Sequence, residues 1–345
     1  MKAAVIGCGK IAQVRHIPEY RDNPDAELYG FYDVNQDRAR QLAEQYGGRS
    51  YSSVEDLLAD KEIQGVSVCA ANHVHAAITI QALKAGKHVL CEKPMAVTLQ
   101  ECEDMVQAAE EHHRILMIGQ NQRFAKAHRE AKKILLRGDI GKVLTFRCTF
   151  GHRGPESWSV DAGPGNWFFD KKKAAMGAMA DLGVHKTDLI QYLLDDVVAE
   201  TTAKVVTLDK RDTQGNLIGV DDNAVCIYQM KSGILGTMTA SWTYYGEEDN
   251  STVLYGTEGI MKIYAHPQYS LEVIRKNGGT VRYEIDSIQT NDNQTKSGII
   301  DEFVSAVKDG RECEVPGKSV LSAMRAVFGS VESGRTGKTV VIDVL

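Results

Sequence analysis

The sequence predicts two domains, an α/β domain with a doubly wound parallel sheet and an α+β domain with a large, open, mostly antiparallel sheet. The chain has 345 residues, which is more than one hydrophobic core usually serves. Over about the first 120 residues, short apolar runs alternate with amphipathic helical runs, as is typical of a parallel sheet covered by helices. Farther along, strand-like runs follow one another through turns, which predicts an antiparallel meander. We therefore divide the chain into residues 1–122 and 123–345.

In the first domain, strands are expected over residues 2–6, 27–32, 65–70, 88–91 and 115–119. Helices are expected between them, at 36–46, 54–59, 75–85 and 99–113. Gly86 stands where a glycine commonly ends a helix, and Thr98 with Glu101 matches a capping box at a helix start. This alternation of strands and helices is that of one doubly wound, nucleotide-binding type of domain.

In the second domain, a helix over 126–137, ended by Gly138, comes before a series of strands. These are expected over residues 142–150, 201–208, 224–230, 234–242, 252–255 and 259–264. Two helices, 298–307 and 319–331, precede a last strand at 339–343. The loop over 151–175 is rich in Gly, Pro and Trp, and a loop of this length suggests a functional role.

Composition excludes several classes of protein. Hydrophobic residues make up 43% and charged residues 25% of the chain, which argues against disorder and fibrous repeats. The net charge is -6, and the longest basic run is Lys171–Lys173, so no nucleic-acid partner is expected. The amino end lacks the apolar core of a signal peptide, and no run is long enough to cross a membrane. The seven scattered cysteines, without C-x-x-C spacing, favour a reducing cytoplasm.

A glycine-rich loop follows the first strand and opens a helix. The segment from Gly7 to Ala12 matches the G-x-G-x-x-G/A pattern of a Rossmann domain, in which the glycines allow a tight turn and close approach to a pyrophosphate. Asp33 ends the second strand, where a carboxylate binds a ribose diol and repels a 2′-phosphate, so NAD is favoured over NADP. A methyltransferase that binds S-adenosylmethionine would present the same two features. The loop residues expected to bind the cofactor are Gly7, Gly9, Lys10 and Ile11.

Three residues far apart in the sequence form a candidate catalytic set. Lys93 follows the strand at 88–91, at the carboxyl edge where open α/β sheets bind ligands. Asp181 and His185 are four residues apart, so they share one face if their segment is helical. A lysine, an aspartate and a histidine can orient a secondary alcohol and accept its proton while hydride leaves, because the pKa of histidine is near neutral.

Four segments together form a recognisable set of motifs: Gly7–Ala12, Asn72–His75, Gly86–Pro94 and Asp181–His185. In these motifs the sequence resembles the Gfo/Idh/MocA family of sugar and cyclitol oxidoreductases, and the likeness extends through 333–338. The resemblance implies a dehydrogenase of CH–OH groups, in which Lys93 bonds the reacting hydroxyl, His185 accepts its proton and Asp181 positions the substrate or the histidine. Glu92 would lie near the nicotinamide, and Asn72 and His75 would line the cofactor cleft. Ala71 departs from the family, which usually has proline there.

The resemblance also implies a small polyol or sugar substrate and a homodimer or homotetramer formed through the open sheet. Arg123 lies where family members commonly touch the substrate, although an ion pair between domains would explain it equally well. Other candidates for the substrate pocket are His152, Trp167 and Tyr244, because aromatic faces suit sugar rings and histidine can bond hydroxyls.

Two alternatives concern metal binding and catalysis. His73, His75, His112 and His113 lack a partner carboxylate or cysteine at metal-ligand spacing, so no metal is expected. A catalytically silent sensor of sugar or dinucleotide with the same fold is the second functional hypothesis. The joint presence of Lys93, Asp181 and His185 argues against it, since a sensor has no need of a proton acceptor.

Overall fold

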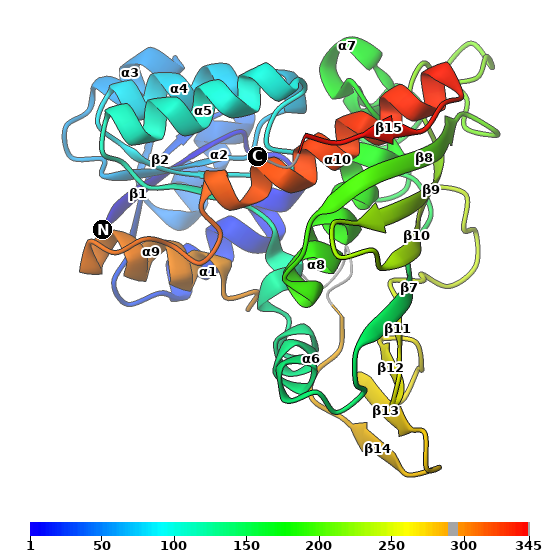
Figure 1. The fold of residues 1–345 in the computed structure, drawn as a ribbon. Helices are drawn as coiled ribbons and strands as arrows, with labels where there is room; N and C mark the ends of the chain where they lie inside the picture. Colours follow the sequence, from blue (N-terminus) through cyan, green and yellow to red (C-terminus); the bar gives the residue numbers. More distant parts are fainter. Residues whose placement is uncertain (289–295, 344–345) are drawn as a thin grey trace.

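The first part of the chain forms a six-stranded parallel sheet (Figure 1). In the computed structural model, which describes residues 1–288 and 296–343, its strand order is β3-β2-β1-β4-β5-β6. All five strand pairs are parallel, so the predicted doubly wound domain is confirmed. The strands are β1 (Lys2–Ile6), β2 (Glu27–Tyr32), β3 (Arg49–Ser50), β4 (Gly65–Val68), β5 (His88–Cys91) and β6 (Leu116–Ile118).

Helices cover both faces of this sheet. Figure 1 shows α4 and α5 together on one face and α1 beside α9 on the other. Thr98 caps α5 through the predicted capping box with Glu101. The helical segments here are the π-helical η1 (Ala12–His16), α1 (Ile17–Asp22), α2 (Gln36–Tyr46), α3 (Val54–Ala59), the 3₁₀ turn η2 (Asn72–Val74), α4 (His75–Lys84), α5 (Leu99–Glu111) and the 3₁₀ turn η3 (Asn121–Phe124).

The second part of the chain forms a nine-stranded mixed sheet in the order β14-β13-β12-β11-β7-β10-β9-β8-β15. Only β7 and β10 pair in parallel among its described strands, so the mostly antiparallel sheet is confirmed. The strands are β7 (Val143–Gly151), β8 (Val198–Val206), β9 (Asn223–Met230), β10 (Leu235–Ser241), β11 (Thr252–Gly256), β12 (Gly259–Ile263), β13 (Leu271–Arg275), β14 (Thr280–Tyr283) and β15 (Val340–Val341).

The helices of this part lie mainly against one face of the larger sheet. Helix α8 is buried along most of its length, and α10 packs against both α8 and β8. Gly138 ends α6 in the left-handed conformation, as its position predicts. The helical segments are α6 (Lys126–Arg137), the 3₁₀ turn η4 (Trp167–Phe169), α7 (Lys171–Ala174), the π-helical η5 (Met179–Gly183), α8 (Val184–Leu194), α9 (Ile299–Asp309) and α10 (Gly317–Thr336).

The segment after the strands of the larger sheet returns to the first sheet, before β15 joins the larger sheet. The backbone N–H of Ile118 donates to the Val315 carbonyl at 3.1 Å, and the buried ring of Phe303 packs against Gly65. The two sheets use separate stretches of sequence, whereas helix α10 contacts β6 of the first sheet and β8 of the larger one. The division between residues 122 and 123 stays a prediction.

Candidate active site

One large cleft lies at the carboxyl ends of the parallel strands. Its volume is about 1340 Å³, above the range of pockets that hold drug-sized ligands. Residues of the glycine loop and of the ends of β2 and β5 line one side, and residues of the 151–175 loop and of η5 line the other. The cleft therefore has a wall from each part of the chain, which we call the cofactor wall and the substrate wall.

The glycine loop leaves space for a ligand at its second glycine. Gly7 has a φ of +90°, and a Cβ on it would lie 2.5 Å from the Ala70 nitrogen, so this position requires glycine. A Cβ on Gly9 would contact no atom within 4 Å, although Gly9 lines the cleft. This open cradle of backbone suits the pyrophosphate of a dinucleotide. Lys10 and Ile11 also line the cleft.

Asp33 is held rigidly beside this loop. Its side chain accepts hydrogen bonds from the backbone nitrogens of Cys8 and Asn35, both at 2.7 Å, and the residue is 6% exposed. Nη1 of Arg38 lies 3.8 Å from its carboxylate, and Nη2 of the same guanidinium lies 2.9 Å from Asp161 on the substrate wall. The sequence analysis did not identify Arg38, which has no motif of its own.

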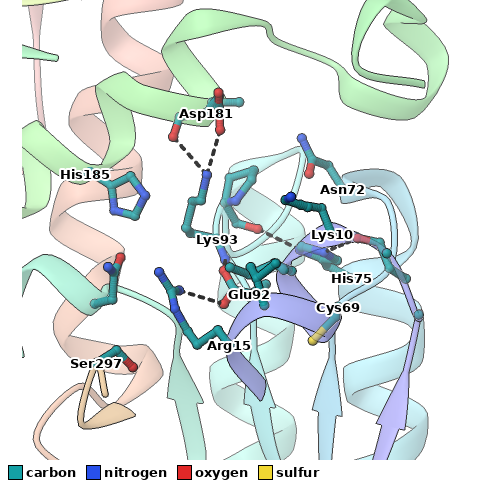
Figure 2. Close-up of a pocket in the computed structure, with 18 of the residues that line it drawn as sticks. Lys10, Arg15, Cys69, Asn72, His75, Glu92, Lys93, Asp181, His185 and Ser297 are labelled. Carbon is teal, nitrogen blue, oxygen red and sulfur yellow. Dashed lines mark hydrogen bonds and ion pairs between the residues drawn. The ribbon is translucent and has the colours of Figure 1, made fainter. Parts of the chain in front are cut away.

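The structure brings Lys93, Asp181 and His185 together (Figure 2). The Lys93 ammonium donates to Asp181 Oδ1 at 2.8 Å and to its backbone carbonyl at 2.9 Å. Trp242 Nε1 donates to the other carboxylate oxygen at 3.0 Å. Burial opposes ionisation of Asp181, but Lys93 and these hydrogen bonds hold its pKa below the usual value. The carboxylate is therefore charged and fixes the lysine in place.

His185 faces Lys93 from the first turn of α8 (Figure 2). Asp181 lies in the π-helical segment η5 just before that helix, so the two residues share the helical stretch that their spacing predicts. Burial, and then the positive charge of Lys93, lower the pKa of His185 well below its usual value. The imidazole is therefore neutral near pH 7 and able to accept a proton.

Glu92 lies in a charged cluster on the cofactor wall. Its carboxylate is 3.3 Å from Arg15 Nη1 and 2.9 Å from His16 Nε2, and His16 Nδ1 is 2.9 Å from the Ser67 hydroxyl. Burial opposes ionisation of Glu92, but the hydrogen bond to His16 and the charge of Arg15 hold its pKa far below the usual value. Arg15 and His16 belong to η1, which carries no sequence signal of function.

Asn72 and His75 both line the cleft. The side chain of each also forms hydrogen bonds with the backbone of other segments. Asn72 donates to the Ala174 carbonyl at 3.0 Å, which ties the cofactor wall to the other part of the chain. The ring nitrogens of His75 lie 2.8 Å from the Pro94 carbonyl and 2.9 Å from that of Ala70. Ala71 has φ -70° and ψ 149°, which are angles that proline adopts readily, so the backbone here would also accept the family's usual proline.

Two of the four residues predicted to line the substrate pocket do line the cleft. His152 and Trp167 line the cleft, whereas Arg123 and Tyr244 are not among the described residues that do. The Arg123 guanidinium makes two hydrogen bonds to Asp188, at 2.5 and 2.7 Å, and Tyr244 packs over Gly151. Arg123 is thus engaged in an ion pair, but within residues 123–345 and not between the two predicted domains, and the substrate roles of all four residues stay predictions.

The substrate wall also contains aromatic residues that the sequence analysis missed. Trp158 lies edge-on to His152, with 6.2 Å between ring centroids, and edge-on to Phe168 at 5.1 Å. Phe168 stacks on Trp167 at 3.8 Å. All four rings line the cleft. The sequence feature that could have identified them is their position in the long 151–175 loop, which was predicted to have a functional role.

Three absences apply to the described residues only. Residues 1–288 and 296–343 contain no group of three or more His, Cys, Asp or Glu side chains that could hold a metal ion. No helix in that part of the chain is both long and apolar enough to cross a membrane. All seven cysteines are buried there without a disulfide.

A Rossmann domain that faces an open sheet across one cleft defines a class of two-domain, dinucleotide-dependent oxidoreductases. Residues 1–120 match the model of an oxidoreductase family with an NAD-binding Rossmann fold, and residues 128–262 match the GFO/IDH/MocA C-terminal domain. The chain therefore belongs to the Gfo/Idh/MocA oxidoreductase family, and its first domain is an NAD(P)-binding Rossmann domain.

Several curated relatives of this chain are named as sugar or inositol enzymes. The chain is 30% identical to myo-inositol 2-dehydrogenase of Thermotoga maritima over 260 residues, covering 75% of this chain and 74% of that protein. It is also 30% identical to glucose-6-phosphate 3-dehydrogenase of Bacillus subtilis, over 70% of this chain and 67% of that protein. A solved levoglucosan dehydrogenase with NADH and L-sorbose has the same fold, with a TM-score of 0.88, 23% identity and 99% coverage of each chain.

Proposed function

We propose that this protein is an NAD-dependent dehydrogenase that interconverts a secondary hydroxyl and a ketone on a sugar, a sugar derivative or inositol. The observation that carries the proposal is the placement of Lys93 and His185 side by side in the cleft, at the carboxyl edge of the Rossmann sheet. The similarity to inositol and sugar dehydrogenases supports the substrate class.

The proposed chemistry assigns one role to each residue of the set. Lys93 donates two hydrogen bonds to Asp181, so one ammonium N–H is left for the substrate oxygen. That donor polarises the hydroxyl, and neutral His185 accepts its proton as the C–H bond breaks and a hydride leaves. Bound NAD⁺ supplies the hydride acceptor. In the reverse direction, the imidazolium of His185 returns the proton to the carbonyl oxygen.

NAD is the proposed cofactor rather than NADP. Asp33 points a buried carboxylate at the edge of the cleft where the adenosine ribose binds in Rossmann domains, and this charge would repel a 2′-phosphate. Arg38 is the feature that would favour NADP, because arginine accommodates that phosphate. Its guanidinium is already shared between Asp33 and Asp161, which supports NAD.

The proposed assembly is a homodimer or homotetramer formed through the larger sheet. Strand register places a set of half-exposed apolar side chains on one face across β8 to β11. These are Val206, Val225, Ile227, Leu235 and Tyr255. An apolar patch of this kind commonly marks a protein interface.

Light scattering measures whether that sheet forms the interface. Ile227 is 55% exposed at the centre of the patch, and we expect Ile227→Glu to lower the mass in solution to that of the monomer. Leu136 is also an exposed apolar residue, but it lies on α6. Leu136→Glu should therefore leave the mass in solution unchanged. A wild-type monomer would contradict the proposed assembly.

The function is tested by a screen of sugars and inositols that follows the absorbance of the reduced cofactor. On an accepted substrate, Lys93→Met and His185→Asn should each lower turnover by about 10²- to 10⁴-fold, the usual contribution of such acid–base groups. Calorimetry should show that both variants still bind NAD. Lys133→Met, at an exposed lysine on α6, is the control and should have wild-type activity.

Two outcomes would overturn the proposal. If both active-site variants kept the wild-type rate, the assigned roles would be wrong. If the wild-type protein bound NAD but reduced it with no compound of the screen, the silent sensor would replace the dehydrogenase. Tight binding of S-adenosylmethionine without NAD binding would instead restore the methyltransferase hypothesis.

A further inference from the structure

We propose that Gln120 is the positioning residue that selects the tautomer of His185 and aims its Nε2 at the substrate. The proposal rests on the function above, in which His185 accepts the hydroxyl proton. Gln120 Oε1 lies 3.0 Å from His185 Nδ1. Gln120 is 1% exposed and His185 is 6% exposed, so water has little access to replace this contact.

The backbone holds Gln120 in place just after β6, buried behind His185. The residue comes two positions after β6, the strand next to β5. The N–H of Gly119 donates to the Cys91 carbonyl at 2.8 Å, and the N–H of Arg123 donates to the Gln120 carbonyl at 3.2 Å. A Cβ on Gly119 would lie 2.9 Å from the Glu92 carboxyl group. The turn is therefore packed against the same strand end that presents Lys93.

The hydrogen bond determines which ring nitrogen can act as the base. A neutral imidazole carries its proton on one nitrogen only. When Nδ1–H donates to the amide oxygen of Gln120, the lone pair is on Nε2, which is free to accept the hydroxyl proton. If the amide were turned round, its NH₂ would donate to Nδ1, and the proton on Nε2 would block the reaction. The proposal thus commits to the amide oxygen as the acceptor.

A neutral partner also suits the charges that surround the histidine. The charged groups that face His185 are Lys93 and Glu92 from the end of β5, Asp181 from η5 and Arg15 from η1. They contribute two positive and two negative charges. An amide fixes the ring without adding a third negative charge, whereas a carboxylate at the same place would stabilise the imidazolium.

The amide group of Gln120 has one further property that fits a positioning role. Its Nε2 is buried without a hydrogen-bond partner among the described residues. An unsatisfied buried donor costs stability, and such costs are tolerated where a side chain serves the active site. The oxygen of the same amide makes the hydrogen bond to the proposed base.

Three variants separate positioning from packing. Gln120→Met keeps the length of the side chain without the acceptor, and we expect kcat to fall by about 10- to 100-fold, with little change in NAD affinity. Gln120→Glu keeps the acceptor and adds a charge, so its activity should persist at high pH. Gln191→Met is the control, because this buried amide on α8 bonds the Val198 N–H and not His185, and it is not among the described residues that line the cleft.

The pH profile of kcat/KM is the readout that packing alone would not change. Alcohol oxidation needs neutral His185, so the rate falls as pH drops through the pKa of the imidazole. Since that pKa is lowered in the wild type, the midpoint should lie below the usual value of about 6.5. In Gln120→Glu the midpoint should rise by about 1 unit or more, and in Gln191→Met it should not move.

The tautomer can be observed directly by NMR. In protein labelled with ¹⁵N-histidine, with the His185 signals assigned from His185→Asn, the NAD-bound wild type should carry its proton on Nδ1. A proton on Nε2, or a wild-type kcat and pH profile in both Gln120 variants, would overturn the inference. If His185→Asn itself retained full turnover, the proposed function would fail whatever the Gln120 variants showed.

Discussion

The two walls of the cleft are built in different ways. On the cofactor wall, the key side chains directly follow strands of one parallel sheet: Asp33 follows β2 and Glu92 follows β5. On the substrate wall, the key side chains come from the irregular 151–175 loop and from the segment before α8. The first wall is defined by short local motifs, whereas the second depends on how distant segments pack together.

The walls also differ in how their charges are satisfied. Glu92 is paired within the cofactor wall, by Arg15 and His16. Lys93 instead crosses the cleft and is held by Asp181 on the opposite wall. The ion pair that positions the proposed catalytic lysine therefore exists only when both walls are in place. This arrangement makes the chemistry depend on the packing of the two parts of the chain.

A change at Asp33 should have the largest effect on the cofactor wall. Asp33→Asn keeps an acceptor for the Cys8 N–H but removes the charge, so NAD should bind about 10- to 100-fold more weakly. Preference should shift towards NADP, because the charge that would repel the 2′-phosphate is gone while Arg38 remains. Steady-state kinetics with both cofactors measure the change, and Asp37→Asn, at an exposed carboxylate on α2, is the control. If the preference for NAD over NADP did not change, Asp33 would not be the residue that binds the adenosine ribose.

The change Trp158→Ala, on the substrate wall, should affect the sugar and leave NAD binding unchanged. Trp158→Ala removes a ring that packs against His152 and Phe168, and the KM for the sugar should rise by about 3- to 10-fold, the range of one aromatic contact. Trp158→Phe should restore most of the loss. NAD affinity, measured by calorimetry, should be that of the wild type. A variant that lost NAD binding instead would assign Trp158 to the cofactor wall.

The same difference explains what could be predicted from sequence. The glycine loop, Asp33 and Lys93 each follow a strand, and the sheet alone brings strand ends together. Most of the larger sheet was predicted from its apolar runs. Strands β13 and β14 were missed, although Asn277, Gly278 and Gly279 form a hairpin turn between them. The short strand β3 has two exposed polar residues and gives no apolar signal.

Contacts between distant residues could not be predicted in this way. Arg123 was a substrate candidate, and its partner Asp188 lies 65 positions away in the sequence. Gln120 stands in a segment without a motif, and its contact with His185 also spans 65 positions. No local pattern specifies which of many polar side chains will meet across such a distance. Motifs therefore identify individual site residues, but only the folded structure identifies the residues that contact them.

The smallest expected effect comes from the contact that joins the two walls near the adenosine end of the cleft. Asp161 is on the 151–175 loop and lies 2.9 Å from Arg38 Nη2 on the cofactor wall. Its side chain is 67% exposed, and exposed ion pairs contribute only about 0.2–1 kcal/mol. Asp161→Asn should therefore raise the dissociation rate of NAD by less than about fivefold, as measured by stopped-flow fluorescence.

Salt provides the internal control for that experiment. Screening weakens an exposed pair, so the difference between Asp161→Asn and the wild type should shrink as ionic strength rises. A double-mutant cycle with Arg38→Ala should show that the two changes are not additive, because both remove the same contact. If the two effects simply added, the loop would act on NAD through other residues, and the two walls would be joined near the adenosine by packing rather than by charge.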